Sequence, residues 1–257
     1  MKYSRRLLLA AVAALAAMAM AAPAAQAATP APGYTQFAGC PSQAENPTIE
    51  VCMRSTIKSG FFKMGTKNVP ISKPMTLSGG MTGNLDGFAA NSKGGLTPVK
   101  QLVPGGVIGL TGLDWLVNFL GIEALQLYAV TEIAGQPHIE FDGLSLPIRV
   151  HLINPVLGNN CYVGSFASPI NLKLKETTSP EYIEDPSGIL TIKNGVFTDK
   201  TFSAPGANGC TLTLFGFIPV SINGLVNSQS GLPAASGKNE TVQNIDIELV
   251  SEELVYP

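Results

Sequence analysis

The stretch TVQNIDIELV, residues 241–250, alternates apolar and polar side chains and indicates the fold class. In an extended chain, Ile245, Ile247 and Leu249 share one face. The opposite face carries Asn244, Asp246, Glu248 and Val250. A period of two residues is typical of a β-strand whose two faces meet different surroundings. We therefore expect a strand here.

Other runs rich in β-branched and aromatic residues recur along the chain, nearly all of them close to Gly, Pro, Asn or Ser. They predict strands at residues 49–56, 60–64, 75–77, 99–102, 125–133, 146–152 and 170–175. Residues 215–228 fit either a strand pair or a short helix. Short strands without βαβ alternation predict a mainly β fold, an antiparallel β-sandwich or barrel with one or two short helices.

The run GILTIKNGVFT, residues 188–198, predicts a hairpin inside this fold. Asn194 and Gly195 suit a type I′ turn, because both of its central residues take positive φ. Such a turn sets Ile192 opposite Phe197. The sequence therefore predicts that the chain reverses direction at Asn194.

The apolar segment 107–130 also resembles a membrane span at first sight. It contains Asp114, Asn118, Glu123 and Gln126. A carboxylate near the centre of a bilayer costs about 3 kcal/mol, so we interpret the segment as core. We expect a short helix over residues 115–120, with Asp114 as its N-cap and Gly121 just after its end. No transmembrane span is expected in the mature protein, which should be soluble.

The first 27 residues have the composition of a secretory signal peptide. Lys2, Arg5 and Arg6 precede an apolar run over residues 7–22, and Ala25-Gln26-Ala27 forms a small-residue cleavage site. We expect residues 28–39 to be a flexible segment and residues 40–257 to form a single β-rich domain. The protein is thus predicted to be secreted, either extracellular or associated with the cell wall.

The charge balance argues against nucleic acid as a partner. The chain has 16 basic and 18 acidic residues, and three of the basic ones lie within residues 1–27, so the remainder carries a net charge of about −5. No cluster of Lys and Arg with interleaved aromatic residues appears, and affinity for phosphate backbones depends on such a cluster.

The four cysteines, Cys40, Cys52, Cys161 and Cys210, form an even number in an exported chain, which favours two disulfides. Three pairings are possible. We favour Cys40 with Cys52, which closes a short loop, and Cys161 with Cys210, because each of the latter lies in a turn rich in Gly and Asn. The alternative is a nucleophilic Cys161 with His151 as its base.

Familiar catalytic motifs are missing from the sequence, and neither a cofactor nor a resident metal is expected. The serine-hydrolase motif G-x-S-x-G is absent, and the only histidines are His138 and His151. Two weak metal-site patterns exist, and we interpret both as solvated surface. They are the strand face of His138, Glu140 and Asp142, and the acidic turn of Glu181, Glu184 and Asp185.

The stretch NPVLGNNCYVGS, residues 154–165, resembles a motif of secreted actinobacterial proteins that have no assigned activity. The resemblance extends over much of the chain after residue 144 and includes SAPGANGC and SGLPAASGKNETVQN. It implies export and association with a Gram-positive envelope or its surroundings. It implies no catalytic residue.

Physically, the motif reads as a turn in which Pro155 ends one strand and a disulfide holds the following loop. Loops held by a rigid scaffold often bind ligands, so Asn159, Asn160 and Tyr162 are the candidate contact residues. We predict a non-enzymatic binding or structural protein of the cell envelope or extracellular space. The alternatives are an extracellular hydrolase of polysaccharide or ester, and a surface-active coat protein with an exposed apolar patch.

Overall fold

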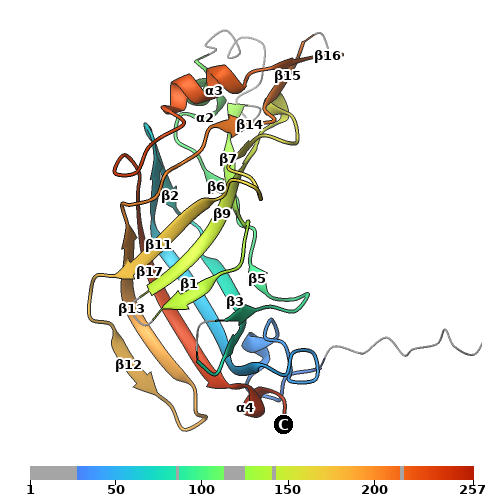
Figure 1. The fold of residues 1–257 in the computed structure, drawn as a ribbon, viewed down its shortest axis with the longest axis vertical. Coiled ribbons are helices and arrows are strands. Elements are labelled where there is room, and N and C mark those ends of the chain that lie inside the picture. Colours follow the sequence, from blue (N-terminus) through green and yellow to red (C-terminus); the bar gives the residue numbers. More distant parts are fainter. Residues whose placement is uncertain (1–27, 85–86, 113–124, 141–142, 215–216) are drawn as a thin grey trace, which may run out of the picture.

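The structure is a computed structural model that describes residues 28–84, 87–112, 125–140, 143–214 and 217–257. The predicted signal peptide and the predicted helix over residues 115–120 lie outside the described residues. The chain forms one large, curled antiparallel sheet that resembles half of a barrel (Figure 1). The mainly β fold class is confirmed. Within the described ranges, no helix has both the length and the apolar character needed to cross a membrane.

The predicted C-terminal strand lies at the centre of this sheet. It is β17 (Glu240–Ser251), and it pairs with β1 (Ile49–Met64) along one edge and with β13 (Leu190–Asp199) along the other. Strand β1 joins two of the predicted strands into one. Ile245 faces the interior, whereas Val250 is buried on the opposite face, against the N-terminal part of the chain.

Shorter strands continue the sheet on both sides of this centre. Beyond β1 lie β2 (Lys67–Ile71), β3 (Met75–Thr82), β4 (Phe88–Ala89) and β5 (Gly95–Leu96). Beyond β13 lie β11 (Ile170–Glu176), β12 (Glu181–Glu184), β9 (Gly143–Ile153), β10 (Tyr162–Val163) and β14 (Ala207–Asn208). The second edge of β9 carries β7 (Tyr128–Ile133) and β8 (His138–Glu140), and β6 (Gln101–Leu102) follows β7.

Each of the two strands that flank β17 has a β-bulge near Asp246. Lys58 is the extra residue in β1, and Lys193 and Asn194 together oppose Asp246 from β13. The Asp246 carboxylate accepts the backbone N–H of Asn194 at 2.8 Å and lies 2.8 Å from Lys58 Nζ. Burial raises the pKa of Asp246, but these hydrogen bonds outweigh it, so the net pKa is lowered from 3.8. Bulges bend strands and increase their twist, so this pair contributes to the curl of the sheet.

The predicted hairpin at Asn194-Gly195 is wrong. Asn194 takes a positive φ of 59°, but Gly195 does not, and a type I′ turn requires positive φ at both. The chain continues through β13, where Gly195 pairs with Ile245 of β17. One left-handed residue produces a bulge, and the long ladder with β17 outweighs the local preference for a turn.

The two margins of the curled sheet are joined by a buried side chain. Gln101 of β6 accepts the backbone N–H groups of Ser72 and Lys73 with its Oε1 and donates from Nε2 to the Lys73 carbonyl at 2.7 Å. Described residues of the interior line two apolar cavities of about 20 and 60 Å³. Each has room for only a few water-sized groups. We therefore regard the interior as a packed core, and we consider the outer face for a binding site.

Both predicted disulfides are confirmed. Cys40 and Cys52 lie with their Cα atoms 5.4 Å apart, and Cys161 and Cys210 at 4.1 Å. The first disulfide lies beside α4 (Glu252–Val255), at the end of the molecule that holds the C terminus (Figure 1). The second lies toward the other end, near α2 (Gly106–Thr111), α3 (Asn223–Ser230) and the separate hairpin of β15 (Thr211–Leu214) and β16 (Ile218–Ser221).

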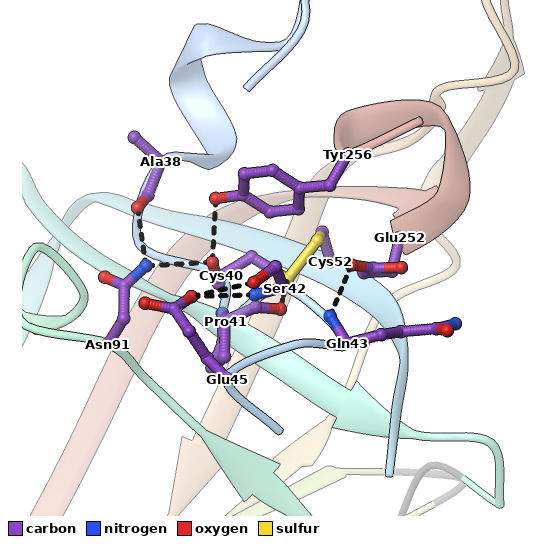
Figure 2. Close-up of a disulfide and its surroundings, with 10 residues drawn as sticks. All are labelled: Ala38, Cys40, Pro41, Ser42, Gln43, Glu45, Cys52, Asn91, Glu252 and Tyr256. Atoms are coloured by element: carbon purple, nitrogen blue, oxygen red, sulfur yellow. Dashed lines mark hydrogen bonds between the residues drawn. A yellow bond between two sulfur atoms is a disulfide. The ribbon is translucent and has the colours of Figure 1, made fainter. Parts of the chain in front are cut away.

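Part of the segment 28–39, which was expected to be flexible, packs against the body. It forms the 3₁₀-helix η2 (Thr35–Phe37), and Phe37 is fully buried. Figure 2 shows how polar groups surround the nearby disulfide. Asn91 donates from Nδ2 to the carbonyls of Ala38 and Cys40, and Tyr256 donates its hydroxyl to the Cys40 carbonyl at 2.9 Å. Burial, together with Glu45 and Glu252, raises the pKa of Tyr256.

Candidate functional site

Strands β7, β9 and β10 place several polar and aromatic side chains on one outer surface. In β9, Leu146, Ile148, Val150 and Leu152 are buried, so Arg149 and His151 alternate with them on the outside. The register sets Glu132 of β7 opposite Arg149, and Tyr162 of β10 opposite His151. Directly opposed side chains in a sheet lie close enough to interact. This surface is the candidate site.

These side chains form a continuous stack of rings and a guanidinium group. The rings of His151 and Tyr162 are stacked, with centroids 4.3 Å apart and planes at 15°. The Arg149 Cζ atom lies 4.3 Å from the Tyr162 centroid and 4.0 Å from that of Phe166. Phe166 remains 66% exposed. Cation–π contacts of this kind hold the rings in place and leave aromatic surface available to solvent.

Ion pairing fixes the guanidinium in this stack. Glu132 Oε2 accepts hydrogen bonds from Arg149 Nη2 at 2.6 Å and from Nε at 2.8 Å. His151 Nδ1 lies 3.7 Å from the other carboxylate oxygen, and His151 Nε2 lies 3.0 Å from the Asn159 carbonyl. A carbonyl only accepts, so Nε2 carries the proton. His151 is thus held by the Nε2 hydrogen bond and by its stacking on Tyr162, and this arrangement suits an orienting role.

The turn that presents Phe166 is short and internally bonded. Gly164 takes a φ of 80°, a conformation that favours glycine. Ser165 donates its backbone N–H to the Ser168 carbonyl, and Ser165 Oγ accepts the backbone N–H of Ser168, both at 3.0 Å. Phe166 is therefore displayed on a defined turn.

A shallow, open groove adjoins the same turn. It has a volume of about 370 Å³, which is within the range of small-molecule sites. Its lining consists of Ser168, Pro169, Ser203, Ala204, Pro205, Pro233, Ala234 and Ala235. Ser168 thus belongs both to the turn of Phe166 and to the groove. Small apolar residues and hydroxyl groups line it, without a charged side chain.

The predicted loop residues lie beside this stack. Asn159 and Asn160 are exposed, and Tyr162 is half-buried within the stack. Gly158 takes a positive φ of 67°, whereas Asn159 and Asn160 take negative φ. Strand β9 ends just before Pro155, and η5 (Pro155–Leu157) follows it. The disulfide of Cys161 then holds the loop beside β14.

Sequence reasoning missed Glu132, Arg149 and Phe166. Strand alternation could have placed Arg149 and His151 on one face. Nothing local indicated that Glu132 or Phe166 would join them, because these residues come from separate strands and turns. For Phe166, the sequence offered one hint, namely an aromatic residue in the Gly/Ser-rich turn GSFAS, residues 164–168.

The other sequence candidates lie elsewhere. His138 is exposed on β8 opposite Ser145, and Asp142 lies outside the described residues. Glu181 and Glu184 are exposed on β12. The Asp185 carboxylate accepts the Ser187 hydroxyl and backbone N–H, which lowers the pKa of Asp185. Among the described residues, no group of three His, Cys, Asp or Glu side chains has the geometry of a metal site.

The arrangement suits non-covalent binding of a ligand with flat apolar faces and hydroxyl groups. The Phe166 ring offers the apolar contact, and the amides of Asn159 and Asn160 offer both donors and acceptors. The charged groups at the stack, Arg149 and Glu132, are already paired with each other. Comparison of the chain with protein-family models, with curated proteins and with solved structures finds no match in any of the three.

Proposed function

We propose that this protein is a secreted, non-enzymatic binding protein of the bacterial cell envelope or extracellular space, and that it contacts envelope polysaccharide. The contact surface is the stack of His151, Tyr162, Arg149 and Phe166, together with the adjoining groove. The two disulfides are compatible with an oxidising, extracellular compartment.

One observation carries the proposal: an exposed aromatic ring is held in place by a guanidinium that is itself held by a carboxylate. Phe166 is 66% exposed while Arg149 contacts its ring and Glu132 bonds Arg149. A side chain ordered before binding loses less conformational entropy when a ligand arrives. The apolar face of a sugar ring stacks on such a surface, and asparagine amides bond sugar hydroxyls.

The charge of the surface favours a neutral polymer. Arg149 is neutralised by Glu132, and the chain as a whole is slightly acidic. An anionic polymer would meet no unpaired cation within the stack. A neutral glycan needs only the ring, the amides and the hydroxyl groups of the groove.

Retention on purified cell-wall material tests this function. We expect the wild-type protein to be retained, and Phe166→Ala combined with Asn159→Ala to reduce retention about tenfold or more, since a buried aromatic contact contributes about 1.5–3 kcal/mol. Tyr182→Ala is the matched control, because Tyr182 is 62% exposed on β12, away from the stack. Absence of retention, or equal loss in the control, would contradict the proposal.

A further inference from the structure

The hairpin β15–β16 stands apart from the main sheet. It forms a two-stranded sheet of its own, with four residues in each strand. Figure 1 shows it projecting from the end opposite α4. An isolated two-stranded hairpin is marginally stable in water unless something packs against it. Its exposed residues therefore need an explanation.

The hairpin exposes large apolar side chains. Phe217 is 74% exposed, Ile218 42% and Val220 39%. The register pairs Val220 with Leu212, so apolar residues of both strands share one face. Thr211, Thr213, Pro219 and Ser221 occupy the other face of the strands. The element is thus apolar on one face and at Phe217, and hydroxyl-bearing on the other.

Its base is held firmly to the body. Cys210, the residue before β15, is bonded to Cys161, and its backbone N–H donates to Asn223 Oδ1 at 2.8 Å. Ile222, the residue after β16, donates its N–H to the Cys210 carbonyl at 3.0 Å. The base of the hairpin is therefore fixed to the body by a disulfide and two hydrogen bonds.

Among the described residues, the segments around the hairpin carry no charged side chain. No charged side chain occurs from Thr201 to Gly237, a range that includes β14, β15, β16 and α3. Helix α2, which packs against α3, is also uncharged. Lys67 lies at the margin, where its Nζ donates to the Gly109 carbonyl. A hydrocarbon phase excludes charged side chains, so an uncharged apolar end is complementary to it.

Other possible partners of the hairpin fit its properties less well. A stable protein interface takes about 20–30 residues from each partner, far more than this hairpin offers. Edge-to-edge pairing with a second copy is hindered because Pro219 in β16 has no N–H to donate. Anionic lipid offers no advantage, because the hairpin carries no cation. These observations leave the hydrocarbon margin of an uncharged or zwitterionic lipid surface.

We propose that the β15–β16 hairpin inserts Phe217, Ile218 and Val220 into the outer hydrocarbon margin of a lipid bilayer. The threonine and serine hydroxyls of the other face then contact the headgroup layer. This proposal rests on the envelope location proposed above and adds lipid as a second partner, through a surface distinct from the Phe166 stack. Insertion is driven by apolar burial and is therefore insensitive to salt.

Vesicle flotation tests this proposal with the disulfide-bonded protein. We expect the wild type to float with phosphatidylcholine vesicles equally at low and high salt. Phe217→Ser is expected to weaken the partition coefficient about tenfold, and adding Val220→Ser to weaken it further. Tyr182→Ser removes another exposed aromatic residue, 62% exposed against 74% for Phe217, from the opposite part of the molecule and should bind like the wild type. Thermal unfolding of each variant confirms that it is folded.

Several results would overturn the proposal. These are no flotation of the wild type at millimolar lipid, equal loss in Tyr182→Ser, or binding that requires anionic lipid and disappears in high salt. A wild-type dimer in sedimentation velocity that Phe217→Ser abolishes would identify a second copy as the occupant instead. Retention on lipid-free cell-wall material is measured in parallel. Loss of flotation with retention intact would contradict only the lipid proposal, and the reverse would contradict only the polysaccharide proposal.

Discussion

Phe37 and Phe217 lie at opposite ends of the molecule, and their surroundings differ completely. Phe37 is fully buried with Cys40, Cys52 and Val255, in a region where charged and polar side chains bond the backbone. Phe217 is 74% exposed, in a stretch of sequence, residues 201–237, that has no charged side chain. Both ends carry a disulfide. One disulfide therefore lies within a core, whereas the other anchors the base of an exposed hairpin.

The two phenylalanines give the largest expected contrast. Phe37→Ala should lower the free energy of unfolding by about 4 kcal/mol, since it removes a fully buried aromatic ring and leaves a cavity. Phe217→Ala should change it by less than about 0.5 kcal/mol, because an exposed side chain has few contacts to lose. Urea unfolding of both variants measures the difference. Similar destabilisation would show that the hairpin is part of the core.

The two disulfides are expected to differ less in their contributions to the free energy of unfolding. Their sequence separations are 12 and 49 residues, so the chain-entropy model assigns about 3 kcal/mol to Cys40–Cys52 and about 4 kcal/mol to Cys161–Cys210. We expect the double Cys→Ser variants to follow that order in urea unfolding. Only the Cys161/Cys210 variant should also lose vesicle flotation, because Cys210 precedes the hairpin. Loss of flotation in both would argue that general stability, and not positioning, governs binding.

The smallest expected effect on the free energy of unfolding comes from Tyr256, next to α4. This effect depends on pH. Its pKa is raised from 10.0 by burial and by Glu45 and Glu252. An acid whose folded pKa is raised contributes stability below its unfolded pKa, and that contribution is lost as pH rises through the folded value. Tyr256→Phe, which loses the hydrogen bond to Cys40, should cost about 1 kcal/mol at pH 8.

At pH above about 10, the wild type should lose stability relative to Tyr256→Phe. Denaturant unfolding at a series of pH values measures this trend. Tyr182→Phe serves as the control, because Tyr182 is exposed at 62%. A difference between wild type and Tyr256→Phe that stays constant with pH would mean that the phenol does not ionise on unfolding.

Local pattern was sufficient for much of the fold. The alternation in residues 241–250 predicted β17, and the other apolar runs predicted strands that became β1, β3, β9 and β11. The cysteine pairs followed from even number and local spacing. The region 215–228, left open between strand and helix, contains both β16 and the start of α3. Such features depend on neighbours close in the chain.

The candidate site was predicted only in part. Tyr162 and the two asparagines were identified from a turn motif, but Glu132, Arg149 and Phe166 were not. Their association arises from the registers of β7, β9 and β10, and a shift by one residue would send each side chain to the other face. No local pattern specifies which strands become neighbours.

Residue patterns alone were enough to predict the antiparallel β class and the C-terminal strand and to favour the correct disulfide pairs, because each depends on side-chain periodicity or on the chemistry of nearby residues. The folded chain was needed to show that Asn194 forms a bulge beside Asp246, that Arg149 contacts Phe166, and that the hairpin at Phe217 is exposed. These outcomes depend on contacts between segments far apart in the chain. Such contacts exist only once the sheet has curled.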